Sequence, residues 1–147
     1  MTDAQTIYQA HLDRVSQAIW ASDFKTVMNH KAYPNRMHFP DRTVTFAEPD
    51  PLAVDARQFR ATLANLGATA YHRICTSAAF DPQDADRVIG SHRTYVLRGG
   101  NYVVAPYACD MVLVRRGDDW LTTDITVPDR RAGLPGDSVP ILGKEAE

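Results

Sequence analysis

The sequence has few of the features that mark specialised classes of protein. Its 147 residues include two cysteines, Cys75 and Cys109, and neither has another Cys or His at the close spacing typical of a zinc site. No stretch approaches the ~20 apolar residues of a membrane span, and the first residues lack the basic and apolar segments of a secretory signal. These absences predict reduced thiols, a cytoplasmic location and no membrane partner.

An excess of charge is also missing. Sixteen Lys and Arg residues against eighteen Asp and Glu residues give a net charge of -2, so no general attraction to phosphate backbones is expected. With 44% hydrophobic and 23% charged residues, the composition is that of an ordinary folded protein. The length suits a single core. We therefore predict one domain over residues 1–127 and no nucleic-acid partner.

Three segments in the first half show helical periodicity. Thr2 is expected to cap the first helix, whose buried face recurs every three or four residues, at Tyr8, His11, Leu12, Val15 and Ile19. Ser22 is expected to cap a second helix that ends before Pro34. A third helix is predicted to begin at Asp55 and to end at Gly67.

The chain beyond residue 67 is predicted to form strands. Turn signals at residues 81–84, 99–101 and 117–119 separate four expected strands, which are residues 69–80, 87–98, 102–116 and 120–127. Residues 37–47 suit a hairpin around Pro40-Asp41-Arg42. Three Pro and three Gly in residues 128–147 favour an extended tail.

This order of elements indicates an α+β fold. Tight turns predict an antiparallel meander, and the three helices are expected to cover one face of a strongly curved sheet. Such packing commonly leaves a cavity between the helices and the concave face, and this cavity is the default ligand site.

Strand alternation predicts which residues face that cavity, because residues two apart share a face. We take Arg87, Arg93 and Arg73 as outward markers. The expected inward residues on the first two long strands are then His72, Ile74, Thr76, Ala78, Phe80, Val88, Gly90, His92, Thr94 and Val96. On the third long strand, Asp110, Val112 and Val114 are expected inward, unless a bulge reverses the alternation.

The same alternation leaves an apolar outer face on the last two strands. Its expected residues are Met111, Leu113, Leu121, Ile125 and Val127. A monomer rarely exposes so continuous an apolar patch, so a homodimer through the outer sheet face is predicted. Cover by the tail is the alternative.

The candidate catalytic residues are His72, His92 and Asp110. Two imidazoles and one carboxylate among apolar neighbours can hold a water and transfer a proton near neutral pH without a cofactor. Each could equally be a buried side chain with satisfied hydrogen bonds. A non-haem iron site with these three ligands is a minor alternative. Cys75 faces away from His72, which argues against a Cys-His pair.

Two local motifs carry a family resemblance. Residues 20–24, Trp-Ala-Ser-Asp-Phe, and the hairpin of residues 110–120 resemble segments of the nuclear transport factor 2-like (NTF2-like) superfamily in its SnoaL-like branch. The resemblance covers residues 4–127 and implies a cystatin-like α+β fold with a cone-shaped pocket. Its members include lyases, isomerases and binding proteins, so fold alone does not fix function.

A sharper resemblance lies within the expected sheet. Residues 71–73 and 86–93 are similar to the segments of scytalone dehydratases that carry two catalytic histidines, which would correspond to His72 and His92. Asp110 falls where ketosteroid isomerases have a hydrogen-bonding aspartic acid. The isomerase tyrosine corresponds to Val15, and its general base falls near Phe39, so the full set of neither family is present.

From these observations the sequence predicts a cofactor-independent enzyme. It would dehydrate or isomerise a small apolar carbonyl compound or hydroxylated ring compound. The expected substrate-binding residues are Tyr8, Val15, His38, Phe39, Ile74, Thr94 and Val112. The alternative is a non-catalytic, dimeric ligand-binding module with the same fold.

Overall fold

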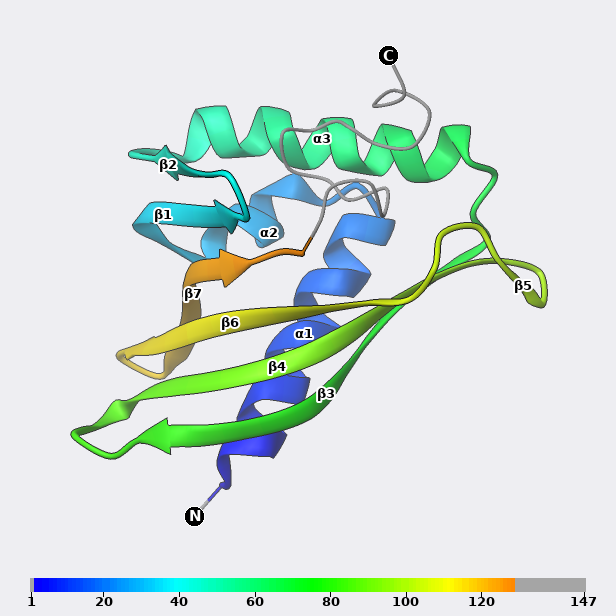
Figure 1. Ribbon diagram of the computed structural model, residues 1–147. Coiled ribbons are helices and arrows are strands. Elements are labelled where there is room, and N and C mark those ends of the chain that lie inside the picture. The colour runs from blue at the N-terminus through cyan, green and yellow to red at the C-terminus, as the bar shows by residue number, and fades with distance from the viewer. Residues whose placement is uncertain (1, 129–147) are drawn as a thin grey trace.

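A computed structural model describes residues 2–128 of the chain (Figure 1). Two helices, α1 (Ala4–Trp20) and α2 (Phe24–Asn29), precede a hairpin, and a third helix, α3 (Pro49–Asn65), follows it. The strands are β1 (Lys31–Phe39), β2 (Arg42–Phe46), β3 (Ala70–Asp81), β4 (Asp84–Arg98), β5 (Asn101–Tyr102), β6 (Tyr107–Arg116) and β7 (Asp119–Thr126). The predicted α+β order is confirmed.

The helix starts differ from the sequence predictions. Asp3, and not Thr2, caps α1 by accepting the Thr6 N–H at 2.7 Å. Asp23 caps α2 in the same way, because Ser22 adopts a left-handed φ of 60°. Helix α3 begins two turns before the predicted Asp55, with proline in its first turn, where the missing N–H needs no partner.

The sheet contains seven strands in the order β2-β1-β7-β6-β4-β3, with β5 on β4. Neighbouring strands are antiparallel except β1 and β7, which pair in parallel. The antiparallel meander predicted for the four long strands is confirmed in β3, β4, β6 and β7, and the hairpin predicted within residues 37–47 is confirmed in β1 and β2. The parallel pairing of β1 with β7 departs from the expected antiparallel sheet. Helix α2 ends at Asn29, before Pro34 as predicted, and Pro34 itself lies within β1, where the register with β7 shifts.

Helices α1 and α3 cover the concave side of the sheet, and α1 lies behind the long strands in Figure 1. One core cluster joins α1 and α3 to β4 and β6 around Val15, Phe59 and Val96. A second cluster lies under the first half of α1, around Tyr8, Leu12 and Leu113. The functional question is which polar side chains enter this interior.

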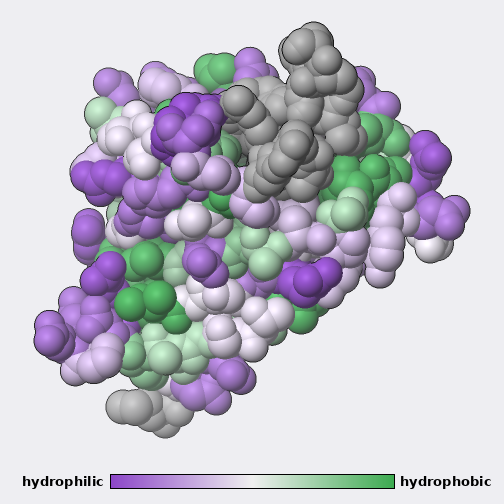
Figure 2. Space-filling model, viewed as in Figure 1, coloured by the Kyte–Doolittle hydropathy of each residue, from purple (hydrophilic) through white to green (hydrophobic). Residues whose placement is uncertain are grey.

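The outer face is not the predicted apolar patch. Met111, Leu113 and Val127 are buried, so this part of the prediction is wrong. The large apolar residues exposed on the outer sheet face are instead Ile74 and Ile89. Figure 2 shows apolar side chains in separate patches among polar ones on the face viewed in Figure 1. The predicted homodimer therefore loses the residues on which it rested.

Two further sequence predictions concern the whole chain. Both cysteines are free thiols. No helix among residues 2–128 is both long and apolar enough to span a bilayer. Residues 129–147 of the expected tail lie outside the described residues.

Candidate functional site

The orientation of β4 is the one that the sequence predicts. Val88, His92, Thr94 and Val96 are all buried on its inner side, and His92 is fully inaccessible. Between them the outward residues are exposed or half-buried. Because β4 lies between β3 and β6, its register fixes which residues of those strands share its inner face.

Asp110 lies on the outer face, which corrects the prediction. His92 pairs with Cys109 across the β4–β6 ladder, and Ser91 pairs with Asp110. Directly paired residues share a face, so Cys109 enters the interior with His92 while Asp110 faces out. There Asp110 accepts a 2.5 Å hydrogen bond from the Ser91 hydroxyl. Val112, two residues further, is half-buried and shares this outward alternation.

His72 also lies on the outer face, contrary to the prediction. The prediction assumed that Arg73 faces outward, and this assumption is wrong. Arg73 is buried at 8% exposure, so its neighbours His72 and Ile74 are exposed. A register shift between Cys75 and Ser77 then reverses the alternation. Ala78 and Phe80 therefore do pack inward, as predicted. The three candidate catalytic residues do not converge.

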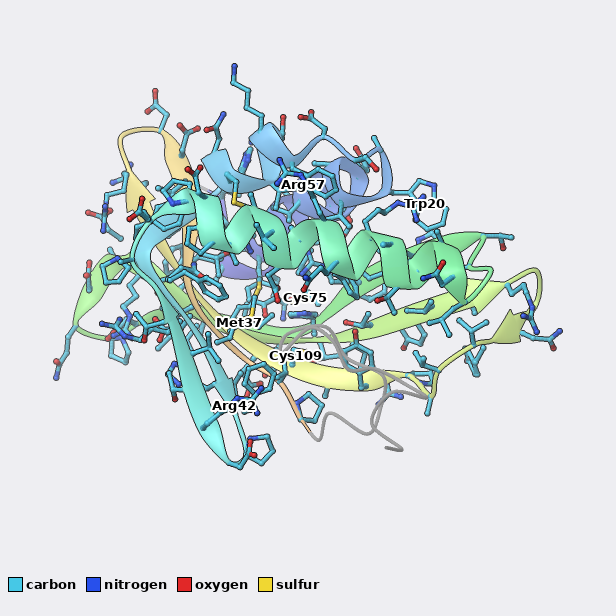
Figure 3. The ribbon with its side chains drawn as sticks, turned by 90° about the horizontal axis from the view of Figure 1, so that it is seen from above. Trp20, Met37, Arg42, Arg57, Cys75 and Cys109 are labelled. Atoms are coloured by element: carbon cyan, nitrogen blue, oxygen red, sulfur yellow. The ribbon has the colours of Figure 1, made fainter. Side chains whose placement is uncertain are left out.

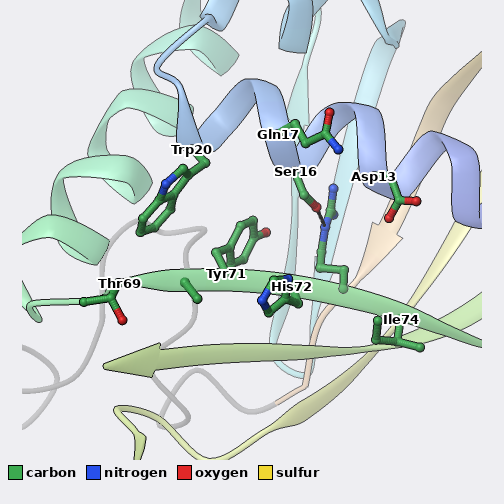
Figure 4. A pocket seen from close by; sticks show the side chains of 10 residues that line it. Asp13, Ser16, Gln17, Trp20, Thr69, Tyr71, His72 and Ile74 are labelled. Atoms are coloured by element: carbon green, nitrogen blue, oxygen red, sulfur yellow. Dashed lines mark hydrogen bonds between the residues drawn. The ribbon is translucent and has the colours of Figure 1, made fainter. Parts of the chain in front are cut away.

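His72 lies beside a surface groove of about 370 Å³ between α1 and β3 (Figure 4). Asp13, Ser16 and Gln17 of α1 face the strand across this groove. Arg73 also lines this groove and donates from Nε to the Ser16 hydroxyl at 2.7 Å. His72 is therefore separated from His92 by the sheet.

The interior cavity lies between α3 and the concave face and has a volume of about 80 Å³. In the view of Figure 3, α3 crosses over the sheet beside Met37 and Cys109, two of the lining residues. The apolar lining includes Ile19, Leu52, Ala56, Phe59, Met37 and Ile125. The polar lining residues are Lys31, Asp55, Tyr71, Arg73, His92, Thr94, Tyr107 and Cys109.

Tyr8 and His92 form a buried pair at the side of this cavity. The Tyr8 hydroxyl lies 2.7 Å from His92 Nδ1, and both residues are fully buried. If the hydroxyl donates to Nδ1, the ring hydrogen is on Nε2, and Nε2 is the one group of the pair without a partner. If the ring hydrogen is on Nδ1, both the hydroxyl hydrogen and Nε2 lack a partner. We therefore assign the neutral ring with its hydrogen on Nε2.

His92 Nε2 is buried and has no hydrogen-bond partner among the described residues. Burial lowers the pKa of His92 to about 3, with a smaller contribution from the positive charge of Arg73. The ring is thus a neutral hydrogen-bond donor at physiological pH. Because buried polar groups are nearly always paired, this donor can take a water or a ligand oxygen as its partner.

Arg73 places a buried cation among these groups. Its hydrogen bonds among residues 2–128 go to neutral oxygens, the Ser16 hydroxyl and, at 3.5 Å, the Leu12 carbonyl. Its charge lowers the pKa of His92 and opposes the burial that raises the pKa of Tyr71 and Tyr107. A buried cation with only neutral partners favours an anionic or strongly polar ligand oxygen nearby.

Lys31 and Asp55 complete the charged lining. Burial, and secondarily the charge of Arg73, lower the pKa of Lys31 to about 8, while Asp55 opposes this shift. Asp55 is the one carboxylate among the described residues that line the cavity. The interior therefore holds two basic groups, one carboxylate and one neutral imidazole donor.

The remaining predicted binding residues divide between interior and exterior. Thr94 lines the cavity, and Tyr8 acts through His92. Val15 and Phe39 are core residues outside the cavity wall. His38 bonds to Asp124 Oδ2 at 2.7 Å and to Thr43 at 3.0 Å, so its ring is satisfied elsewhere.

The iron alternative is also wrong in its geometry, because His92 lies inside the sheet and the other two ligands lie outside it. Among residues 2–128, no group of three or more His, Cys, Asp or Glu side chains is placed to hold a metal ion.

Sequence reasoning missed Arg73, Lys31 and Asp55. Arg73 was assigned to solvent from its charge, which is the usual location of arginine. Lys31 opens β1 immediately after α2, and Asp55 lies in the middle of α3, so neither belongs to a motif. Asp55, a polar residue on the cavity side of α3, was the one available signal, and it was interpreted as the start of the third helix.

Gly90 makes room for the Tyr8 ring. A Cβ at this position would lie 2.5 Å from Tyr8 Cε2 and 2.8 Å from the Ser77 carbonyl oxygen. We expect Gly90→Ala to displace Tyr8, break its bond to His92 and destabilise the fold by about 1–3 kcal/mol. Urea unfolding measures this. Gly100→Ala, where nothing lies within 4 Å, is the control, and equal stability of the two variants would contradict the assignment.

The comparisons with known proteins identify the fold of this chain but no specific activity. No protein-family model matches the chain, and no curated protein matches it in sequence. Solved structures do match. An NTF2-like protein with a cystatin-like fold from Novosphingobium aromaticivorans superimposes with a TM-score of 0.63 at 11% identity, over 85% of this chain and 80% of its own.

Two other matches carry enzyme names. The beta subunit of benzoate 1,2-dioxygenase from Burkholderia mallei gives a TM-score of 0.60 at 13% identity, over 87% of this chain and 91% of that subunit. A candidate dehydratase of the NTF2-like family from Streptomyces avermitilis gives 0.60 at 13% identity, over 84% of this chain and 95% of its own. At such identities the similarity establishes the fold alone.

Proposed function

We propose, starting from the NTF2-like, cystatin-like fold of this chain, that its interior cavity binds a small carbonyl compound and catalyses proton transfer on it. The observation that carries the proposal is the unpaired Nε2 of His92 at the cavity wall. The reaction class is isomerisation or dehydration, and both proceed by removal of a proton next to a carbonyl group.

Each polar group has a role in this proposal. His92 donates from Nε2 to the substrate oxygen, which becomes negatively charged when the neighbouring C–H bond breaks. Arg73 stabilises the same charge without donating a proton. Asp55 accepts the proton as general base. Tyr8 is a positioning residue, because its hydroxyl holds the His92 ring in the donating tautomer.

The cavity volume limits the substrate. A dry protein cavity that binds benzene measures roughly 150 Å³, about twice the 80 Å³ found between α3 and the sheet. The volume therefore favours a short ketone, aldehyde or oxo acid over a complete ring. A ring compound would enter only with its oxygen-bearing edge unless α3 moves.

The first test is binding. Ligand-observed NMR with acetone, butanone and pyruvate is expected to detect binding to the wild type. Ala56→Leu, which fills the cavity from α3, is expected to abolish it. Ala61→Leu on the exposed face of the same helix is the matched control and is expected to bind normally. Binding that survives in Ala56→Leu would place the site elsewhere.

The second test is turnover. In D₂O, removal of a proton next to the carbonyl appears as exchange of that proton for deuterium in the NMR spectrum of the ligand. We expect exchange to fall ~100-fold or more in Asp55→Asn and in His92→Gln, since general bases and oxyanion donors each contribute about this much. Binding without any exchange in the wild type would favour the non-catalytic binding module.

A further inference from the structure

Lys31 is a basic side chain that the proposed proton transfer does not use. It opens β1, opposite Thr122 of β7, and its side chain lines the interior cavity. Among residues 2–128 it makes no hydrogen bond and no ion pair. The residue is half-buried, and the carboxylate of Asp55 acts on its charge.

Three titratable groups from other elements interact electrostatically with Lys31. Arg73 of β3 and His11 of α1 contribute basic groups, and Asp55 of α3 contributes a carboxylate. His11 is neutral, because burial and the charge of Lys31 lower its pKa well below the usual value. Its Nε2 bonds to the Thr122 hydroxyl at 2.6 Å, so His11 is a satisfied neighbour and not a competitor.

A neutral amine is the nucleophilic form of lysine. With a pKa of about 8, roughly one Lys31 in ten carries a neutral amine at pH 7, about 300 times the fraction of an ordinary lysine. Burial beside another cation is the environment that activates imine-forming lysines.

We propose that Lys31 forms an imine with a short 2-oxo acid or aldehyde bound in the interior cavity. This proposal rests on the proposed function, because it needs a carbonyl compound in the cavity. It adds a covalent step and a substrate class that the proton transfer alone does not require. The carboxylate of a 2-oxo acid also supplies the anion that buried Arg73 lacks.

The step is balanced without any oxidant or reductant. The neutral Lys31 nitrogen attacks the carbonyl carbon, a C–N bond forms, and the C=O π electrons move to oxygen. The nitrogen passes one of its two protons to this oxygen. The C–O bond of the resulting carbinolamine then breaks, and water leaves with a second proton from Asp55, which had received it when the Lys31 ammonium became neutral, so the imine nitrogen keeps one hydrogen. The protonated imine draws electrons from the adjacent carbon, so its C–H bond becomes acidic. Hydrolysis regenerates the amine.

Reductive trapping tests this directly on the full chain. Pyruvate and sodium cyanoborohydride are added at pH 7, and the modified lysine is located by peptide mass spectrometry. We expect Lys31 to be labelled at least ~10 times faster than Lys25, an exposed lysine on α2 that serves as the internal control. Labelling of Lys25 at the same rate as Lys31 would overturn the proposal.

Two variants separate the imine from simple binding. Lys31→Arg keeps the positive charge but cannot form an imine, and Lys31→Met removes both. We expect both variants to lose the trapped adduct and to exchange the methyl protons of pyruvate at least ~10 times more slowly. Lys31→Met, which also removes a positive charge from the cavity lining, is expected to bind pyruvate more weakly than Lys31→Arg. Undiminished proton exchange in Lys31→Arg would refute the imine and leave the proton-transfer proposal intact. If the wild-type protein binds no carbonyl compound, both proposals are refuted.

Discussion

Arg73→Met is expected to stabilise the protein and to inactivate it. The guanidinium is buried, and its hydrogen bonds within residues 2–128 go to neutral oxygens. Methionine fills similar space without a charge to desolvate, and replacing buried charges with apolar side chains of similar volume commonly gains about 1–4 kcal/mol. The Ser16 hydroxyl that loses its donor can bond to the Leu12 carbonyl one turn back. Urea unfolding and pyruvate binding measure the two effects.

The matched control is Arg93→Met, on the exposed outer face of β4. We expect it to change stability by less than ~0.5 kcal/mol and to leave binding unchanged. A destabilisation of 2 kcal/mol or more in Arg73→Met would mean that Arg73 is chiefly a structural support for α1. Such a result would contradict the proposal that the Arg73 charge binds an anionic ligand.

His92→Phe is expected to reduce the sensitivity of the fold to acid. In the folded protein the pKa of His92 is lowered to about 3, so between that pH and 6.5 only the unfolded chain takes up this proton. Stability therefore falls as the pH decreases through this window, by roughly 4 kcal/mol for this residue. Phenylalanine cannot be protonated, and the Tyr8 hydroxyl loses its acceptor at every pH, so this loss changes the stability but not its slope with pH.

Unfolding free energies measured from pH 7 to pH 4 check this prediction. The slope is expected to be shallower in His92→Phe but not zero, because the pKa of buried His11 is also lowered. His72→Gln, at an exposed site, is expected to keep the slope of the wild type. Parallel curves for His92→Phe and the wild type would show that His92 is already protonated in the fold.

The sequence is sufficient to predict most of the fold. Helical periodicity and turn residues place α1 and the strands β3, β4 and β7 within a few residues, and the left-handed Gly67 follows α3 as expected. The starts of α3 and β6 are placed less well. Local signals fail at the helix caps, because Thr2 and Asp3, or Ser22 and Asp23, are chemically equivalent candidates. The parallel pairing of β1 with β7 is a long-range contact that no local pattern marks.

The candidate site is less predictable, for a geometric reason. A single wrong marker reverses a whole strand, and Arg73 was that marker on β3. His92 and Thr94 were placed correctly because two exposed arginines fixed β4. No residue of β6 marked which way Asp110 faces. Once the register is known, the pairing of His92 with Cys109 determines that Asp110 faces outward. The residues of the proposed site are therefore His92, Arg73, Lys31 and Asp55 in place of the predicted His-His-Asp set.

The most direct test of the account is the protonation state of His92 with and without a ligand. Long-range ¹H–¹⁵N NMR of the histidine rings at pH 5, assigned by the signal lost in His92→Gln, reports it. We predict a neutral ring with hydrogen on Nε2 whose signal shifts when pyruvate is added, while the His72 signal does not. A protonated His92, or a ligand response at His72 alone, would contradict the interior site.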